Sequence, residues 1–515
     1  MSTHNLYAAL RAGFPADLDS IAIETADGPG GQDFKPLYYT WRDLDRASAR
    51  MANLLDFLEI PAGSRVAVQV DKSVENLILY LAVLRAGHTY LPLNNAYQAA
   101  EIEYFIGNAE PAVVVCSPKN FGWISKIAFQ KGTRHVFTLG DDRSGTLLER
   151  AAVHGDDHAV APSRADDLAA ILYTSGTTGR SKGAMLSHRN LLSNAQVLQR
   201  YWGWRSGDVL IHSLPIFHVH GLFVACHGAL LNGSKMIWFS RFDPKATIAR
   251  MSEASVFMGV PTLYVRMLGE ASLTPQACGH MRLFISGSAP LLTETFNDWK
   301  ARTGHTILER YGMSETVMLT SNPYHAQDGE RIGGTVGFAL PGVGVRVQGD
   351  AGECGVGDIG GIEVKGPNVF AGYWRMPEKT KEEFTADGWF KTGDVGMKDG
   401  SGRITIVGRS KDLIISGGYI VYPAEIEGVL NDMSGVAESA VIGVPHSDFG
   451  EAVVAVVIPK AGAALDVAQM TSLLKSRIAN FKVPKRIFIE GELPRNTMGK
   501  VQKNLLREQH KALFA

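Results

Sequence analysis

Along the first third of the chain, segments with apolar residues at helical spacing alternate with short, continuous apolar runs. Two stretches repeat apolar side chains along one helix face, at residues 42–58 and 75–85. Short apolar runs separate or follow them, at 66–70, 90–93 and 113–116. Such runs are typical of strands that are buried on both faces. The alternation of strands and helices therefore predicts a parallel sheet covered by helices.

The same alternation of strand and helix patterns returns from about residue 168 to 320. After that the pattern changes twice. After residue 333 glycines become frequent and the expected strands are short, at 342–347, 361–365 and 403–407. Frequent glycines and short strands favour a small twisted β-subdomain. Beyond Gly408 the chain mixes helical and strand patterns in an α+β manner.

These patterns predict a fold of the α/β plus α+β class. A chain of 515 residues is too long for one ordinary domain. We expect a large N-terminal domain over residues 1–408, made of two βα-layered subdomains and the twisted β-subdomain. A small, mobile α+β domain is expected over residues 409–515.

Composition narrows the classes of function. The chain is 45% hydrophobic and 20% charged, with a net charge of −1, so nothing indicates electrostatic binding to nucleic acid or an anionic membrane. The four cysteines form no CxxC pair, which argues against a disulfide framework or a zinc site. The first twenty or so residues lack an apolar signal core, and no apolar run reaches about 18 residues. We expect a cytoplasmic protein.

The densest local motif lies between Tyr173 and Gly183. It reads Tyr-Thr-Ser-Gly-Thr-Thr-Gly-Arg-Ser-Lys-Gly and follows an apolar run at 168–172. Its glycines allow the backbone to approach a ligand closely, its backbone N–H groups can surround an anion, and Lys182 adds a compact cation that suits phosphate. The spacing does not match the Walker A pattern. A flexible surface loop is the alternative, but so many hydroxyls and glycines beside a lysine favour phosphate binding.

This loop resembles the signature of the adenylate-forming superfamily, which contains acyl-CoA synthetases, firefly luciferase and the adenylation domains of peptide synthetases. Further segments resemble motifs of that superfamily in the expected order, at 84–93, 217–221, 311–316, 388–394, 408–412 and 494–500. The resemblance covers nearly the whole chain from about residue 20. It implies an enzyme that forms an acyl-adenylate from a carboxylic acid and ATP, and then passes the acyl group to coenzyme A.

The resemblance also implies ATP, Mg²⁺ and coenzyme A as cofactors. Thr174 and Glu315 are expected to hold Mg²⁺, which prefers hard oxygen ligands. The implied ATP-binding residues are Thr174, Ser175, Gly176, Thr177, Thr178, Gly179, Lys182, Ser288, Ala289, Pro290, Glu309, Arg310, Tyr311, Gly312, Met313, Ser314, Asp394, Ile406 and Arg409. Taken alone, Glu315 also fits a solvated acid at a helix N-terminus, and Asp394 fits an ordinary turn aspartate.

Lys500 follows a turn at 496–499 and resembles the catalytic lysine of the superfamily. A positioned ammonium group stabilises the negative charge that builds on the α-phosphate as pyrophosphate leaves, whereas a surface lysine is the alternative. The resemblance implies that Thr174, Glu315 and Lys500 are catalytic. It also implies a hinge at Lys411 and a passage for coenzyme A at Ser416, Gly417 and Gly418, so that the C-terminal domain acts as a lid.

The acyl pocket is expected at His218, Val219, His220, Arg266, Ser286 and Met318. Guanidinium matches carboxylate in a bidentate pair, so Arg266 with His220 and a serine is expected to hold a second carboxylate. The alternative is that Arg266 extends to solvent from its helix. Segments 211–225, 282–292, 308–316 and 367–374 resemble malonyl-CoA synthetases, relatives of which often accept methylmalonate. Val219 and Met318 would then determine how large a substituent on the substrate's α-carbon the pocket accepts.

Three other functions stay open at this point. They are a CoA ligase for another short mono- or dicarboxylic acid, an adenylation enzyme that loads a carrier protein, and a non-catalytic binding relative, against which the retained catalytic residues argue. The expected partners are the acid, ATP and coenzyme A, without nucleic acid or membrane. A lysine acyltransferase and deacylase are further candidates, because acylation of Lys500 would remove its charge.

Overall fold

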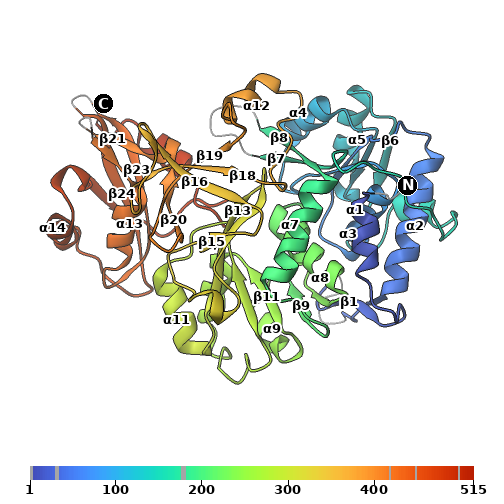
Figure 1. The fold of residues 1–515 in the computed structure, drawn as a ribbon, viewed down its shortest axis with the longest axis horizontal. Coiled ribbons are helices and arrows are strands. Elements are labelled where there is room, and N and C mark those ends of the chain that lie inside the picture. Colours follow the sequence, from blue (N-terminus) through green and yellow to red (C-terminus); the bar gives the residue numbers. More distant parts are fainter. Residues whose placement is uncertain are drawn as a thin grey trace.

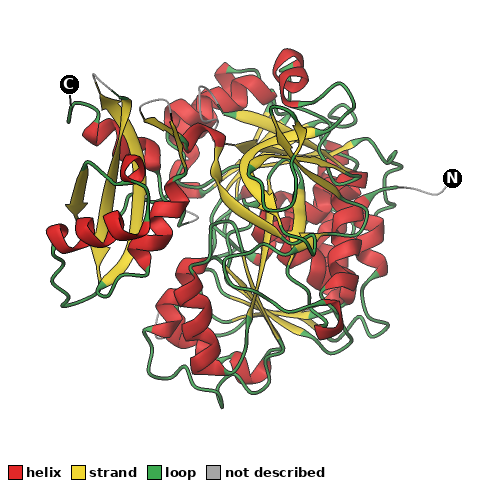
Figure 2. Cartoon of the chain, turned by 60° about the vertical axis from the view of Figure 1, so that its left-hand side comes forward, coloured by secondary structure: helices red, strands yellow, loops and turns green. Residues whose placement is uncertain are grey.

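The computed structural model describes residues 4–28, 34–174, 181–416, 419–446, 449–496 and 499–514. They form four β-sheets with helices packed around them (Figure 1). Figure 2 shows the last sheet and its helices as a separate unit beside the other three. The arrangement confirms the predicted class, with a large N-terminal domain and a small α+β C-terminal domain.

The first sheet is parallel except at one edge and has the order β6-β5-β3-β4-β7-β8. Its strands are β3 (Arg65–Gln69), β4 (Thr89–Pro92), β5 (Val113–Cys116), β6 (His135–Thr138), β7 (Leu168–Thr174) and β8 (Lys182–Ser187). Its helices are α2 (Trp41–Phe57), α3 (Val74–Arg85), α4 (Ala99–Ala109), α5 (Phe121–Gln130) and α6 (Thr146–Ala151). The residues of α3 are buried along its whole length, as expected for a helix that is apolar on all sides.

The second sheet has the order β15-β14-β13-β12-β11-β9-β10-β1-β2. Its strands are β1 (Ile21–Thr25), β2 (Tyr38–Thr40), β9 (Val209–His212), β10 (Lys235–Trp238), β11 (Val256–Gly259), β12 (Leu283–Ser286), β13 (Ile307–Met313), β14 (Val317–Ser321) and β15 (Phe338–Ala339). The helices around it are α1 (Leu6–Ala12), α7 (His188–Tyr201), α8 (His227–Asn232), α9 (Pro244–Ala249), α10 (Pro261–Leu268) and α11 (Thr293–Thr303). The pairs from β1 to β13 are parallel, so their carboxyl ends lie along one edge.

The third sheet is the predicted twisted β-subdomain, and it is antiparallel. Its strands are β16 (Gly344–Gly349), β17 (Gly352–Glu353), β18 (Gly360–Lys365), β19 (Phe390–Lys398) and β20 (Ile404–Arg409), with α12 (Pro377–Glu383) beside them. The fourth sheet contains β21 (Ile414–Ser416), β22 (Tyr419–Val421), β23 (Val436–His446), β24 (Gly450–Pro459) and β25 (Arg486–Ile489), with α13 (Pro423–Asn431), α14 (Val467–Arg477) and α15 (Lys503–His510). The chain passes between these two sheets through a 3₁₀ turn at Ser410–Asp412. A domain boundary directly after residue 408 stays a prediction.

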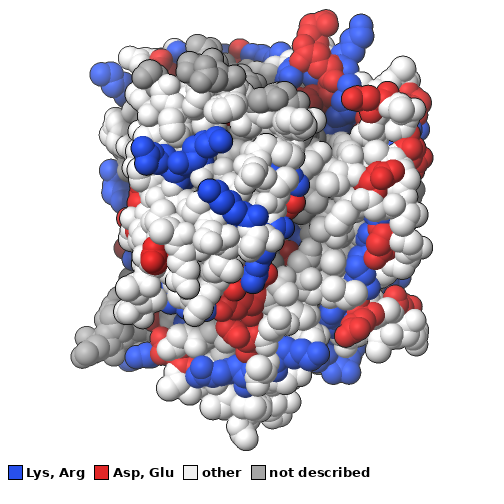
Figure 3. Space-filling model, turned by 90° about the vertical axis from the view of Figure 1, so that its left-hand side faces the viewer, with Lys and Arg blue, Asp and Glu red and all other residues white. Residues whose placement is uncertain are grey.

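The surface mixes charges of both signs. Figure 3, which faces the end of the molecule formed by the C-terminal domain, shows Lys and Arg interspersed with Asp and Glu. Among the described helices none is both long and apolar enough to span a bilayer.

A buried ion pair in the second sheet joins the residue before β9, Asp208, to the residue before β12, Arg282. Arg282 donates from Nε to Asp208 at 2.8 Å, pairs with it a second time through Nη2, and both side chains are buried. We expect Asp208→Ala to lower the free energy of unfolding by about 3–5 kcal/mol, because Arg282 is left as an uncompensated buried charge. Denaturant unfolding measures this. The matched control is Asp166→Ala, which removes an exposed partner of Arg189 and should change stability by less than about 1 kcal/mol; equal effects would contradict the prediction.

Candidate active site

The residues predicted to bind the ribose lie together where β13 meets the hairpin β19–β20. Asp394 is buried, accepts a hydrogen bond from the Tyr311 hydroxyl at 2.5 Å and pairs with Arg409 Nε at 2.6 Å. Burial and the adjacent carboxylate of Asp394 raise the pKa of Tyr311 well above its ordinary value. Ile406 lies on β20 in the same hairpin. The Asp394 carboxylate is therefore held in one orientation, with acceptor capacity left for hydroxyl groups of a ligand.

Glu315 lies in the tight turn between β13 and β14 and not at a helix N-terminus. Gly312 makes this turn possible, because a Cβ there would lie 1.9 Å from the Val317 carbonyl oxygen. Glu315 is buried and accepts a hydrogen bond from the Tyr373 hydroxyl at 3.0 Å. Burial raises its pKa, although the charges of Arg409 and Lys182 act in the opposite direction.

A divalent cation fits this carboxylate. Among the described residues no positively charged side chain forms an ion pair with Glu315, so a bound cation would compensate its buried charge. The described residues contain no cluster of three His, Cys, Asp or Glu that could hold a metal alone. Mg²⁺ is commonly held by one or two carboxylates together with phosphate oxygens and water, which matches a single carboxylate next to a nucleotide site.

The phosphate loop connects the two strands of a hairpin. Ser175, Gly176, Thr177, Thr178 and Gly179 lie outside the described residues. The loop leaves β7 at Thr174 and returns at Lys182 on β8, with α7 beginning only after Ser187. Lys182 Nζ pairs with Glu383 at 3.3 Å and lies 4.3 Å from the centre of the Tyr373 ring. The base of the loop therefore contacts the tyrosine that orients Glu315.

The segment Ser288–Ala289–Pro290 follows β12 and contains a strained residue. Ser288 has a φ of 72°, which a non-glycine residue adopts rarely and mostly at functional sites. Its Oγ lies 3.3 Å from His220 Nδ1, so this loop contacts the acyl-pocket motif. Glu309 accepts a hydrogen bond from the Leu291 N–H at 3.0 Å, and burial raises its pKa to about 8.

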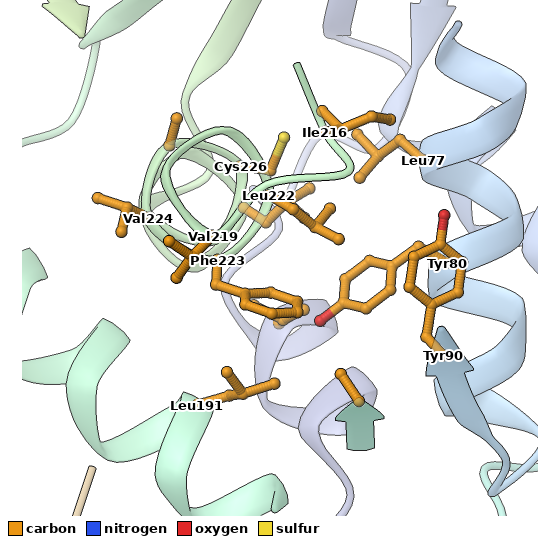
Figure 4. Close-up of a cluster of buried hydrophobic side chains, with 14 of the residues drawn as sticks. Leu77, Tyr80, Tyr90, Leu191, Ile216, Val219, Leu222, Phe223, Val224 and Cys226 are labelled. Carbon is orange, nitrogen blue, oxygen red and sulfur yellow. The ribbon is translucent and has the colours of Figure 1, made fainter. Parts of the chain in front are cut away.

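The acyl-pocket motif lies at the start of a π-helix, His220–Cys226, an element found frequently at functional sites. Figure 4 shows how this helix is fixed: Leu222 and Phe223 face Leu77 and Tyr80 of α3, with 6.0 Å between the Phe223 and Tyr80 rings. Packing of this kind holds the motif's backbone in place.

Two imidazoles of this motif, His218 and His220, are held in their neutral form. The backbone N–H of His220 donates to His218 Nδ1 at 3.2 Å. Burial, with the charges of Arg310 and Lys500, lowers the pKa of His218 to about 4, and burial lowers that of His220 well below its ordinary value. A neutral His218 whose Nδ1 accepts a hydrogen bond carries its proton on Nε2 and can donate it to a ligand oxygen.

The remaining acyl-pocket predictions divide into buried and exposed residues. Val219, Ser286 and Met318 are buried. Arg266 is exposed on α10, with its guanidinium 4.9 Å from the centre of the Phe242 ring, and among the described contacts it has no hydrogen bond to His220. Phe242 lines a cavity of about 330 Å³ that Phe217 also lines. The contact of Arg266 with a second carboxylate stays a prediction.

Lys500 lies where the C-terminal domain meets α10 of the N-terminal domain. Solvent reaches its side chain, yet surrounding protein and the positive charges of Arg409 and Lys411 lower its pKa to about 8, while Asp394 acts in the opposite direction. The turn before it rests on α10, where a Cβ at Gly499 would lie 2.9 Å from the Thr262 hydroxyl. The structure thus brings Lys500, from the far end of the chain, to the ribose-site residues.

The predicted hinge residue Lys411 is exposed within the 3₁₀ turn between the third and fourth sheets. Its neighbour Asp412 pairs with Arg507 of α15 at 2.6 Å. Ser416 is buried and pairs with Gly450. Gly417 and Gly418 lie outside the described residues.

Sequence reasoning missed two residues of the site. Tyr373, which contacts both Glu315 and Lys182, lies in the segment 367–374 that resembles malonyl-CoA synthetases, but only the fold indicates its role. Glu383, the partner of Lys182, lies on α12 in a run of charged residues that looks like any solvated helix face. No local pattern could have paired it with a residue 201 positions earlier.

Comparison with known proteins adds to this geometry. A family model described as AMP-binding enzyme matches residues 29–374, and one described as AMP-binding enzyme C-terminal domain matches residues 425–500. The chain is 34% identical over 478 residues to a malonate–CoA ligase of Arabidopsis thaliana, which covers 87% of this chain and 78% of that protein. It is 53% identical to MatB from Rhodopseudomonas palustris over 100% of both chains, with a TM-score of 0.95 for the ATP-bound crystal structure and 0.84 for the apo structure.

Proposed function

Because the chain belongs to the AMP-binding enzyme family, we propose that it is an AMP-forming acid–CoA ligase that makes malonyl-CoA from malonate, ATP and coenzyme A. We extend the proposal to methylmalonate. The observation that carries it is that Lys500 lies near two groups of residues: the Asp394–Arg409 pair proposed for the nucleotide, whose charges act on its pKa, and the neutral imidazole of His218, whose pKa its charge lowers.

In the first step, a carboxylate oxygen of the acid attacks the α-phosphorus of ATP, the bond to the β-phosphate oxygen breaks, and pyrophosphate leaves. Asp394 accepts hydrogen bonds from the ribose hydroxyls, as carboxylates do at other nucleotide sites. The Lys500 ammonium stabilises the charge that builds on the α-phosphate. His218 donates from Nε2 to an oxygen of the reacting groups.

Glu315 and Thr174 would hold Mg²⁺, which supplies positive charge to the phosphates when it is bound. Tyr373 keeps the Glu315 carboxylate oriented, and Lys182 adds a further positive charge at the base of the phosphate loop. These residues position the triphosphate and neutralise it, and neither role requires a proton transfer.

In the second step, the sulfur of coenzyme A attacks the acyl carbon, the bond to the AMP oxygen breaks, and AMP leaves as the thioester forms. We propose that rotation about Lys411 removes Lys500 from the site and brings the segment from Ser416 to Gly418 to it. The C-terminal domain then serves both half-reactions, since hinge residues absorb the backbone change of such a motion.

A panel of acids tests the proposed function. Purified enzyme with ATP, Mg²⁺ and coenzyme A is offered malonate, methylmalonate, acetate and hexanoate, and thioester and AMP are measured. We expect kcat/KM for malonate to exceed that for either monocarboxylate by at least about 100-fold, because a monocarboxylate leaves buried polar groups unpaired. Thioesters of acetate or hexanoate without those of malonate or methylmalonate would refute the proposal, and adenylate formation without transfer to free coenzyme A would favour a carrier-loading enzyme.

Specificity within the dicarboxylates is proposed to depend on Val219 and Met318, which are buried beside the motif. Arg266 is proposed to contribute charge from the pocket's edge, so Arg266→Ala should lower activity on malonate. We also propose that the enzyme works in the cytoplasm, in keeping with free cysteines at all four positions, and that acylation of Lys500 switches adenylation off by removing its charge.

A further inference from the structure

The amine of Lys72 is surrounded by neutral hydrogen-bond acceptors. The residue lies between β3 and α3, and its Nζ lies 2.9 Å from His212 Nδ1, 3.0 Å from the His212 carbonyl oxygen and 2.6 Å from that of Phe239. The Trp238 ring is centred 4.3 Å from it. Three acceptors match the three N–H donors of an ammonium group, and the ring face adds a cation–π contact. Lys72 therefore joins the first sheet to the ends of β9 and β10 in the second.

These contacts determine which nitrogen of His212 carries the proton. An ammonium group donates and cannot accept, so Nδ1, which faces Lys72, is the acceptor. Nε2 lies 2.9 Å from the Gly221 carbonyl oxygen, which can only accept. Burial, together with the charge of Lys72, lowers the pKa of His212 well below its ordinary value. A neutral imidazole with its proton on Nε2 satisfies both partners, whereas the opposite tautomer satisfies neither.

The hydrogen bond from His212 to Gly221 closes the loop that carries the acyl-pocket motif. His212 is the last residue of β9, and Gly221 lies in the first turn of the π-helix. Residues 213–220 lie between them and include His218 and His220. One side-chain hydrogen bond, whose donor is specified by the lysine, therefore fixes the motif to the end of the strand.

Lys72 also borders open space, which makes its role accessible to experiment. It lines the cavity of about 330 Å³ that Phe217 lines. The adjacent carboxylate of Asp71 pairs with Lys119 at 2.8 Å, and among the described residues no carboxylate forms an ion pair with Lys72. Burial lowers the pKa of Lys72 to about 7, so its ammonium form prevails below that pH. A shortened side chain here would leave room beside the cavity for a small amine.

We infer that Lys72 is a positioning residue for the acid substrate: its ammonium group holds His212 in the tautomer that binds Gly221, and this bond keeps the acyl-pocket motif in its binding-competent position. The inference rests on the proposed function, because it takes this motif as the site of the acid. Without the ammonium group, the motif is displaced in part of the enzyme population. The apparent affinity for the acid then falls in proportion to the fraction that remains competent, while the rate at saturating acid is retained.

Pyrophosphate exchange with varied malonate, at about pH 6.5 where Lys72 is charged, tests this inference. We expect Lys72→Met to raise the KM for malonate by about 10-fold, the order expected when a buried acceptor loses its hydrogen bond. Both kcat and the KM for ATP should change by less than about threefold. Lys72→Ala should behave similarly. Added methylammonium should restore the KM of Lys72→Ala but not that of Lys72→Met, whose longer side chain fills the space.

A second variant, His212→Gln, tests whether Lys72 acts through His212. Glutamine keeps a side-chain N–H donor for Gly221 but lacks the ring nitrogen that faces Lys72. Adding Lys72→Met to His212→Gln should raise the KM for malonate by no more than about twofold further, whereas independent effects would multiply.

Nuclear magnetic resonance of enzyme with ¹⁵N-labelled histidine reports the tautomer directly, and loss of a signal in His212→Gln identifies the His212 ring. In the wild-type enzyme the proton should lie on Nε2. In Lys72→Met the form protonated on Nδ1 should appear, because nothing then donates to that nitrogen. The wild-type spectrum is decisive even if Lys72→Met does not fold.

The matched control is Lys235→Met. Lys235 is the first residue of β10, the strand beside β9, and it pairs with Glu24 at 2.5 Å. This variant also removes a partly buried lysine from the second sheet. It should lower the melting temperature and leave the KM for malonate and the His212 tautomer unchanged.

Any of five results would overturn the inference. They are an unchanged KM for malonate in Lys72→Met, an equal rise in the KM for malonate and ATP, multiplied effects in the double variant, no effect of methylammonium on Lys72→Ala, and a wild-type His212 protonated on Nδ1. Failure of the proposed function is distinct. A wild-type enzyme that uses only monocarboxylic acids would refute that function, and the same measurements with its preferred acid would still test Lys72.

Discussion

Lys500→Ala is expected to lower acyl-adenylate formation by at least about 100-fold, in the range found when one group that stabilises transition-state charge is removed. Transfer to coenzyme A from a supplied acyl-adenylate should stay within a few-fold of wild type, because the second half-reaction develops no such charge at the α-phosphate. Exchange of labelled pyrophosphate into ATP measures the first half-reaction, and thioester formation from synthetic malonyl-adenylate measures the second.

The control for this prediction is Lys503→Ala, which removes a lysine three residues further on whose amine pairs with Glu427 at 2.6 Å. It should affect neither half-reaction by more than a few-fold. The pH profile gives a second readout: with a Lys500 pKa of about 8 in the free enzyme, the charged form is lost as pH rises through 8, and kcat/KM for adenylation should fall there. In Lys500→Arg the fall should disappear. Equal loss of both half-reactions in Lys500→Ala would contradict the assigned role.

The elements of the fold could be predicted where apolar spacing is unambiguous. The run 113–116 is a strand with those same bounds, and the helix expected over 42–58 spans Trp41–Phe57. Both are short-range patterns, since a continuous apolar run or one-sided burial within a few residues determines them. The phosphate loop was harder, because its glycines obscure β8, the strand from Lys182 to Ser187 that lies between the loop and α7.

Individual residues of the candidate site could be predicted from the sequence, but their contacts with one another could not. Glu315 and Asp394 are identifiable from motifs, but their partners Tyr373 and Arg409 lie 58 and 15 positions away in sequence, and only the fold brings them into contact. Arg266 and Arg310 illustrate the limit of such prediction. Arg266 follows a pocket-lining turn and so attracts attention, whereas the environment of Arg310 depends on Gly287, which belongs to a different strand connection.

The positively charged residues of the site differ in whether the chain itself supplies an acidic partner. Arg409 is neutralised within the chain by Asp394, so this pair adds little net charge to the proposed nucleotide site. Arg310 has no such partner among the described residues and therefore favours an anionic ligand. The charge of Lys500 contributes to the lowered pKa of His218.

Glu315→Gln is expected to lower acyl-adenylate formation by about 100- to 1,000-fold, because it removes the buried carboxylate that we propose holds Mg²⁺ while keeping the size of the side chain. The Mg²⁺ concentration for half-maximal pyrophosphate exchange should rise, since a neutral amide is a weaker ligand for a hard cation. Tyr373→Phe serves as the control: it removes the hydroxyl that orients Glu315 but leaves the carboxylate, so its loss should be about tenfold or less. An unchanged Mg²⁺ requirement in Glu315→Gln would show that the carboxylate acts through the fold alone and that the metal is held by other oxygens.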